Sequence, residues 1–248
     1  MVQSKKPSDY GVWWNSNDLD EAWYEKIYSV RPLAHQFFLN WFCDLQRQGA
    51  ETRSILEVGC GRAFPYARFF RNYDYHGTDI SEKEVTACRQ RYQSDEKHFF
   101  ACDAIEGDLK GPYDLVYSHA VIDHVYDINA FLRKLALATH GWLYVSAYAT
   151  WKPDMSEHKY TWHQEVTCFQ NEVSPIEART TLASLGCSNI QVFPVFVGNK
   201  EDDIPFETVI IASRLPQPAT PVTGNRGRRG EGVSRAKLAF WKITRPSV

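Results

Sequence analysis

Acidic side chains stand at the ends of three apolar segments of the sequence, where buried strands are expected to end. Glu57 comes just before the glycine pair Gly59 and Gly61, and a helix-like run follows the glycines. Asp79 ends the second segment and Asp103 ends the third. Glycines let the backbone turn sharply and approach a ligand closely, and a carboxylate about twenty residues further on can accept both hydroxyls of a ribose. This spacing predicts a binding site for a nucleoside-containing ligand.

The glycine turn departs from the fingerprint of dinucleotide-binding proteins. The pattern G-x-G-x-x-G requires a third glycine, and the sequence has Phe64 there, followed by Pro65. A fixed carboxylate at Glu57 would repel a pyrophosphate but attract a cation such as an ammonium or sulfonium group. Cys60, within the turn, is expected to be a small residue that fits the space. The turn therefore favours a cationic ligand over NAD, although an NAD-dependent oxidoreductase would share the fold.

Strand-like and helix-like segments alternate from residue 54 onward. Strands are predicted at 55–58, 75–78, 98–101, 113–118, 142–147, 190–195 and 207–212, and helices at 63–72, 82–93, 128–139 and 175–185. This alternation predicts an α/β fold that is Rossmann-like and doubly wound, with a mainly parallel seven-stranded sheet and helices on both faces. Such sheets bind ligands beyond the carboxyl ends of their strands, which would bring Asp79 and Asp103 together.

Three further stretches define the expected domain organisation. Residues 1–50 carry apolar side chains at spacings of three and four, which predicts an N-terminal helical cap on a domain spanning residues 51–214. Within this domain, residues 149–173 are polar and aromatic without a clear period. A loop of that length is usually functional, so we expect an insert that covers the substrate. Residues 215–248 are rich in Pro, Gly and Arg, which predicts a basic, flexible tail.

Composition and charge exclude several classes of protein. The chain has 248 residues, 44% of them hydrophobic, and a net charge of −2, which is typical of a globular protein rather than a general nucleic-acid binder. No apolar run approaches the roughly 18 residues of a membrane span, and no secretory signal is recognised, so a cytoplasmic location is expected. The six cysteines form no C-x-x-C pair, and His158, His163 and Cys168 make a poor ligand set, so we expect no metal site.

Four motifs together resemble those of a known family. The motifs are E-V-G-C-G at 57–61, T-D-I-S at 78–81, C-D-A at 102–104 and D-L-V-Y-S-H-A-V-I-D-H-V at 114–125. In order and spacing they resemble the motifs of class I S-adenosylmethionine-dependent methyltransferases, and in detail those of the small-molecule methyltransferases. The resemblance covers about residues 51–214, and it implies S-adenosylmethionine as the cofactor. The sequence departs from the family at Arg62, Ala63 and Phe64, where many members have another small residue.

The resemblance also implies a role for each strand end. It implies that the methionine part of the cofactor is held at the first strand, the ribose and adenine at the next two, and the sulfonium above the fourth. In that order, the implied cofactor-binding residues are Glu57, Gly59, Cys60 and Gly61, then Asp79 and Ile80, then Asp103 and Ala104, and finally Ser118 and His119.

Histidines are the candidates for acid–base chemistry. Methyl transfer depends on positioning the acceptor atom, but an acceptor hydroxyl or protonated amine must also lose a proton. A histidine with a pKa near 7 is the base best suited to take that proton. The candidates are His119, His124 and His163, in no fixed order, with Asp123 as a candidate to orient one of them; His124 could equally cap its helix. Four other histidines are expected to be structural, namely His35, His76, His98 and His140.

The expected acceptor is a small molecule, such as a sugar, a glycan end or a natural product, because the polar and aromatic insert suits hydroxylated ligands. Two alternatives are methylation of RNA or protein, and a non-catalytic scaffold that only binds the cofactor. The acidic main domain and the lack of an N-P-P-Y-like segment count against methylation of nucleic-acid bases, whereas the Arg-rich tail leaves RNA open. The tail is expected to be a solvated linker, or else a contact with a second copy of the chain or another partner.

Overall fold

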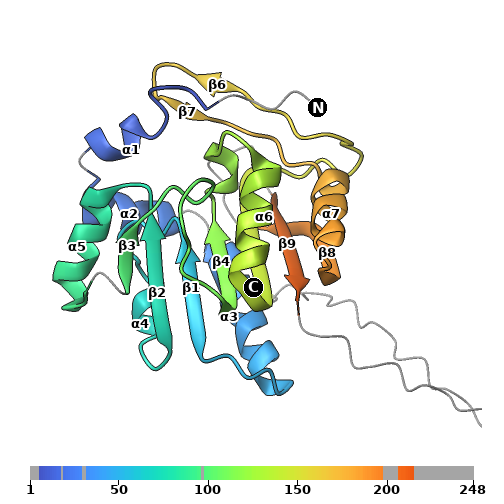
Figure 1. The fold of residues 1–248 in the computed structure, drawn as a ribbon, viewed down its shortest axis with the longest axis horizontal. Helices are drawn as coiled ribbons and strands as arrows, with labels where there is room; N and C mark the ends of the chain where they lie inside the picture. The colour runs from blue at the N-terminus through green and yellow to red at the C-terminus, as the bar shows by residue number, and fades with distance from the viewer. Residues whose placement is uncertain (1–5, 18, 30–31, 96–97, 198–205, 215–248) are drawn as a thin grey trace, which may run out of the picture. The chain divides into compact units, whose positions relative to one another are not determined.

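The computed structural model describes residues 6–17, 19–29, 32–95, 98–197 and 206–214. Its main feature is a seven-stranded sheet with the order β3-β2-β1-β4-β5-β9-β8 (Figure 1). The strands are β1 (Ser54–Val58), β2 (Asp74–Asp79), β3 (Phe99–Ala101), β4 (Tyr113–His119), β5 (Thr139–Thr150), β8 (Ser188–Phe196) and β9 (Phe206–Ser213). Strands β1 to β5 pair in parallel, and β9 runs antiparallel to both β5 and β8. The predicted mainly parallel sheet is confirmed.

Helices cover both faces of this sheet, as the doubly wound prediction requires. The helices are α1 (Val12–Ser16), α2 (Glu21–Ser29), α3 (Pro32–Arg47), α4 (Tyr66–Phe69), α5 (Glu82–Tyr92), α6 (Ile128–Ala138) and α7 (Pro175–Ser184). On one face α6 and α7 pack on Leu56 and Val58, and on the other α3, α4 and α5 pack around Ile55 and Tyr117. None of the helices in the described residues combines the length and apolarity needed to cross a bilayer.

Local sequence explains where several helices begin. The side chains of Ser81, Asp127 and Ser174 each accept a hydrogen bond from a backbone N–H in the first turn of α5, α6 and α7. These are typical N-cap residues, because their short polar side chains satisfy an amide that has no partner inside the helix. Helix α4 is much shorter than the predicted 63–72, because Ala63 has a φ of 53°, which is not helical.

The irregular stretch at 149–173 contains more structure than its sequence indicated. Its first two residues complete β5, and a small hairpin follows, formed by β6 (Trp162–His163) and β7 (Cys168–Phe169). Figure 1 shows this hairpin together with α1 above the carboxyl ends of the parallel strands. The tail predicted for residues 215–248 lies outside the described residues.

Glu57, which was expected to contact a ligand, has its side chain buried on the sheet face that packs against α3, α4 and α5. Side chains alternate between the two faces of a strand, so Glu57 shares its face with Ile55 rather than with Val58. It is buried, and its Oε2 accepts hydrogen bonds from the hydroxyls of Tyr75 and Tyr117, the second at 2.8 Å. Glu57 therefore links β1 to the strands on either side of it.

This buried carboxyl gives the stability of the fold a pH dependence. Burial raises the pKa of Glu57 to about 8, against an ordinary value of 4.5, although the two tyrosine hydroxyls favour its charged form. Between these values the folded chain holds a proton that the unfolded chain has lost. The free energy of unfolding should therefore fall as the pH rises from about 5 to about 8, by at most about 1.4 kcal/mol per pH unit.

Glu57→Gln should reduce this slope, because the amide does not ionise. Urea denaturation at several pH values between 5 and 8.5 measures it, with the exposed Glu51→Gln as the matched control that keeps the wild-type slope. A slope in Glu57→Gln equal to that of the wild type would contradict the assignment.

Candidate active site

A cavity of about 960 Å³ lies at the carboxyl ends of β1 to β4. The strand order reverses between β1 and β4, which is where open α/β sheets bind their ligands. Most of the residues that the sequence singled out line this cavity together. They are Gly59, Cys60, Gly61, Asp79, Ile80, Asp103, Ala104, His119, His124 and His163.

Glu57 and Ser118 do not line the cavity. Glu57 faces the tyrosines described above, and the hydroxyl of Ser118 donates to the carbonyl oxygen of Val58 at 2.8 Å, fully buried. Ser118, which was expected to form part of the floor beneath the sulfonium, therefore ties β4 to β1 and does not itself line the cavity. His119, the next residue, faces the cavity because side chains alternate along β4.

The glycine turn after β1 is hydrogen-bonded to the end of β2. The backbone N–H groups of Gly59 and Cys60 both donate to the carbonyl oxygen of Thr78, at 2.7 and 3.0 Å. The N–H of Gly61 donates to Asp79 Oδ2 at 2.9 Å. Three successive amides of the turn therefore have partners within the protein, whereas a phosphate-binding loop presents its amides to the ligand. The turn therefore differs from a phosphate-binding loop in its hydrogen bonds as well as in its missing third glycine.

Asp79 is held at the edge of the cavity by backbone amides. In addition to the bond from Gly61, its Oδ1 accepts from the N–H of Ser81 at 2.9 Å. Burial raises the pKa of Asp79 above its ordinary value, opposed by the amides of Ser81 and Gly61, which favour the charged form. Each oxygen has one lone pair used in this way, so the carboxylate keeps further capacity to accept hydrogen bonds from a ligand.

Asp103 forms an ion pair with a lysine of the N-terminal segment of the chain. The Lys6 ammonium group lies 2.8 Å from Asp103 Oδ2 and 2.7 Å from Glu106 Oε2. The other oxygen of Asp103 accepts from the N–H of Ile105 at 2.9 Å. Lys6 also approaches the ring of Tyr10, which lines the cavity. The N-terminal segment therefore crosses the part of the cavity where an adenine was expected.

The N-terminal segment and the β6–β7 hairpin are bonded to each other. The amide of the Gln164 side chain donates to Asp9 at 2.8 Å, and the backbone N–H of Trp13 donates to Thr167 Oγ1 at 3.0 Å. Trp14 from the segment and His163 from the hairpin both line the cavity. Two parts of the chain more than a hundred residues apart thus make one cover on this side of the cavity.

His119 lies in an aromatic environment at the end of β4. Its ring stacks on Tyr66 with 5.1 Å between centroids and 11° between planes, and Phe38 and Tyr144 also contact it. Nδ1 lies 3.0 Å from Ser146 Oγ, and Nε2 is buried with no hydrogen-bond partner among the described residues. Burial lowers the pKa of His119 well below its ordinary value, and the nearby His35 adds to this shift.

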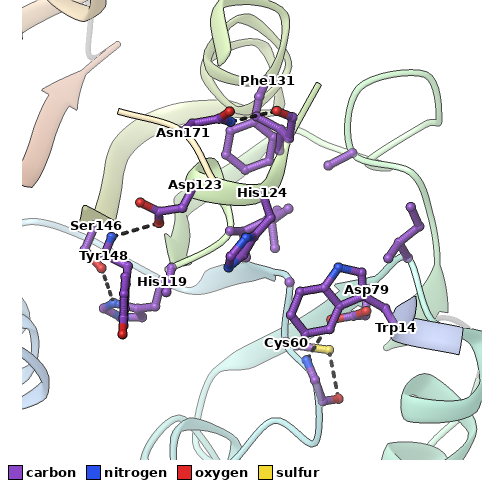
Figure 2. Close-up of a pocket in the computed structure, with 18 of the residues that line it drawn as sticks. Trp14, Cys60, Asp79, His119, Asp123, His124, Phe131, Ser146, Tyr148 and Asn171 are labelled. Carbon is purple, nitrogen blue, oxygen red and sulfur yellow. Dashed lines mark hydrogen bonds between the residues drawn. The ribbon is translucent and has the colours of Figure 1, made fainter. Parts of the chain in front are cut away.

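His124 has a defined tautomer. It ends the short 3₁₀ helix η1 (Ile122–His124), and its Nδ1 lies 2.8 Å from the carbonyl oxygen of Phe169 in β7. A carbonyl oxygen only accepts, so Nδ1 carries the proton and Nε2 of the neutral ring keeps a free lone pair. Figure 2 shows His124 between His119 and Asp123 on one side and Asp79 and Trp14 on the other.

Asp123 does not hold a histidine through a contact that the structure describes, although it was a candidate to do so. Its Oδ2 accepts from the backbone N–H of Tyr148 at 2.8 Å (Figure 2). Its backbone carbonyl oxygen accepts from the backbone N–H of Asn171 at 2.8 Å. His124 is oriented by a backbone carbonyl of the hairpin instead. Asp123 nevertheless lines the cavity, where it adds a buried carboxyl group.

His35 lines the cavity although its sequence context indicated only a structural role. It lies in α3, and its Nδ1 is hydrogen-bonded to the hydroxyl of Tyr66. Its ring is 5.7 Å from that of His119, between centroids. Residues from α2 line the cavity as well, with the Tyr24 hydroxyl close to Gly61. No local pattern identifies these positions, because only the packing of the first helices on the sheet brings them here.

Comparisons with known proteins agree with this fold. A family model described as "Methyltransferase domain" matches residues 56–140. Magnesium protoporphyrin IX methyltransferase from Synechocystis PCC 6803, solved with bound S-adenosylmethionine, is 17% identical over 82% of this chain and 88% of that chain, with a TM-score of 0.53. An amino pentose methyltransferase from Micromonospora echinaspora is 13% identical over 80% and 99%, with a TM-score of 0.54. A search of curated protein sequences finds no match.

The protonation of His119 can be tested directly. Because burial lowers its pKa, we expect the Cε1–H signal of His119 in a proton–carbon NMR spectrum to stay constant from pH 8 to pH 6. An ordinary histidine would titrate with a midpoint of about 6.5. The signal is assigned by its loss in His119→Asn, and a midpoint near the ordinary value would contradict the environment described for this ring.

Proposed function

We propose that this chain, which carries a methyltransferase domain of the class I fold, transfers a methyl group from S-adenosylmethionine to an oxygen or nitrogen atom of a small molecule. When bound, this cofactor supplies a methyl group on a sulfonium, which is a good leaving group. The main support for this proposal is a single cavity that is lined both by carboxyl groups able to hydrogen-bond a nucleoside and by histidines. The family match and the similarity to solved methyltransferase structures support the same activity.

The electrostatics of the cavity favour a cationic cofactor. Carboxyl groups among the lining residues outnumber lysines, with six acids against two lysines. The acids are Asp79, Glu84, Asp103, Asp123, Glu172 and Glu207, and the lysines are Lys26 and Lys152. Glu84, Asp103 and Glu172 are paired with Arg62, Lys6 and Lys152. The other acids include Asp79 beside the glycine turn, where a carboxyl group favours a sulfonium over the pyrophosphate of a dinucleotide. Together with the occupied amides of the glycine turn, this argues against an NAD-dependent oxidoreductase.

Each end of the cavity has residues suited to one part of the cofactor. Asp79 would accept hydrogen bonds from the ribose hydroxyls, because amides fix its carboxylate and leave lone pairs for a ligand. Ile80 and Ala104 would contact the adenine, and the turn at Gly59 would contact the methionine part. The ammonium group of Lys6 lies 2.8 Å from Asp103 Oδ2. Asp103 would therefore have to accept from the adenine and from Lys6 at the same time.

His124 is the base that we assign to the reaction. Its Nδ1 donates a hydrogen bond to the Phe169 carbonyl oxygen, so Nε2 can take the proton that an acceptor hydroxyl or amine loses. His119 is less suited to that role, because burial disfavours its charged form. His119 would instead shape the wall at the acceptor end of the cavity, and His163 from the hairpin would close the same end.

The proposed acceptor is a small hydroxylated or aminated molecule, such as a sugar, a glycan end or a natural product. Thr161, Gln170 and Asn171 add neutral hydrogen-bonding groups to the cavity, which suits a polar molecule. The bonded cover of N-terminal segment and hairpin leaves less room for RNA or a folded protein. The small-molecule substrates named for the similar methyltransferases support the same class. A non-catalytic scaffold is the alternative that the experiments below address.

Asp79→Asn should weaken the binding of S-adenosylhomocysteine at least tenfold in isothermal titration calorimetry. The amide offers one acceptor oxygen in place of two, so it loses part of the ribose contact. The matched control is Asp108→Asn, since Asp108 is an exposed carboxylate outside the cavity lining and should bind like the wild type. Equal affinities for wild type and Asp79→Asn would refute the ribose assignment, and tighter binding of NAD than of S-adenosylhomocysteine would refute the cofactor.

His124→Gln should lower kcat by roughly 10² to 10⁴, the usual contribution of a general base, and leave the affinity for S-adenosylhomocysteine unchanged. Turnover is followed with methyl-labelled cofactor on the best acceptor from a panel of sugars, amino sugars and phenols. The surface variant His140→Gln is the control. A wild-type kcat in His124→Gln would rule out the assigned base, and no transfer to any member of a broad panel would favour the scaffold.

A further inference from the structure

Three ligand-type side chains meet at the amino end of β2, at the opposite end of that strand from Asp79. Asp74 begins β2, His76 lies two residues later, and His98 directly precedes β3. Within the described parts of the chain, this is the one set of three such side chains whose ligand atoms all lie within 4.8 Å of one another. From the sequence, His76 and His98 were expected to be structural, and no metal site was expected.

Both imidazoles lie close to the same carboxylate oxygen. His76 Nε2 lies 3.1 Å from Asp74 Oδ1, and His98 Nε2 lies 3.7 Å from the same atom. The two rings are nearly parallel, with 5.1 Å between centroids and 22° between planes. His76 is buried and packs on Tyr113, which fixes its ring. The pairing of β2 with β3 aligns Gly77 with Phe99, and so places the two histidines side by side.

The second nitrogen of His98 is already used. Nδ1 lies 2.8 Å from Asp95 Oδ1, and a carboxylate only accepts, so Nδ1 carries the proton of the neutral ring. The lone pair of Nε2 then faces the oxygen of Asp74 at a distance too long for a hydrogen bond. A cation between them would bind both groups, in place of the hydrogen bond between His76 Nε2 and the same oxygen. A carboxylate behind a histidine is also the usual way in which metal-binding imidazoles are oriented.

The two separations measured from Asp74 Oδ1 are close to those of a zinc site. Zinc binds histidine nitrogen and carboxylate oxygen at about 2.0–2.2 Å in a tetrahedral arrangement, which puts two ligand atoms roughly 3.4 Å apart. The observed separations of 3.1 and 3.7 Å from Asp74 Oδ1 lie on either side of that value. The Asp74 side chain is 52% exposed, so water can reach the fourth position.

We propose that Asp74, His76 and His98 bind one Zn²⁺ ion, with Asp95 as a positioning residue behind His98. The site is separate from the cavity, because none of these residues lines it. The ion would link the start of β2 to the residue that leads into β3. Since the other end of β2 carries Asp79, the ion would stabilise the strand on which the nucleoside end of the cavity depends.

Zinc binding is tested on the full-length, untagged protein by calorimetry with ZnCl₂ and by metal analysis after dialysis. We expect one ion per chain, bound at least tenfold more weakly in Asp74→Asn and in His98→Gln. Asp95→Asn should also weaken binding, and it should do so without removing a ligand. The matched control is His140→Gln, which removes a single imidazole 2.8 Å from Asp114 and should bind zinc like the wild type.

Cobalt replaces zinc as a spectroscopic probe, because thiolate ligands give a strong near-ultraviolet charge-transfer band that nitrogen and oxygen ligands lack. We expect the cobalt protein to show the visible bands of a tetrahedral site and to lack the thiolate charge-transfer band. Circular dichroism confirms that each variant is folded. The proposal is overturned if the wild type binds no zinc at micromolar concentration, if Asp74→Asn and His98→Gln bind it as tightly as His140→Gln, or if the cobalt spectrum shows thiolate ligation.

Discussion

Hydrogen bonds join the glycine turn after β1 to the end of β2, and this junction positions most of the proposed cofactor site. Two amides of the turn converge on the Thr78 carbonyl, and the third reaches Asp79. A side chain at Gly59 would meet Val121 at 2.1 Å, so only glycine lets the turn pass this close to the segment after β4. The same bonds that shape the turn also fix Asp79, which couples the methionine and ribose ends of the proposed cofactor site.

The other end of the cavity depends on contacts between distant parts of the chain. The hairpin supplies the carbonyl that fixes the tautomer of His124, and the N-terminal segment is hydrogen-bonded to that hairpin. A movement of either part would change the direction in which Nε2 of His124 offers its lone pair. The contacts that cover this end of the cavity therefore also set the orientation of the His124 ring.

The sequence was sufficient for the parts that follow from local patterns. Alternating segments predicted the sheet, and Asp79 and Asp103 were recognised because strand ends converge at one edge. The sequence did not indicate that Glu57 is buried against Tyr75 and Tyr117, because the apolar run around it does not reveal which face each side chain takes. It also missed His35 and the pairing of His76 with His98, which arise from helix packing and from strand register, neither of which leaves a local signal.

A crystal structure with bound S-adenosylhomocysteine would show the position of the cofactor directly. We expect the ribose hydroxyls on the Asp79 carboxylate, the methionine part at the turn that contains Gly59, and the sulfur directed toward the end of the cavity that holds His119 and His124. Space for an acceptor atom should remain between the sulfur and Nε2 of His124. A nucleoside bound away from Asp79, or a sulfur directed away from both histidines, would rule out this arrangement.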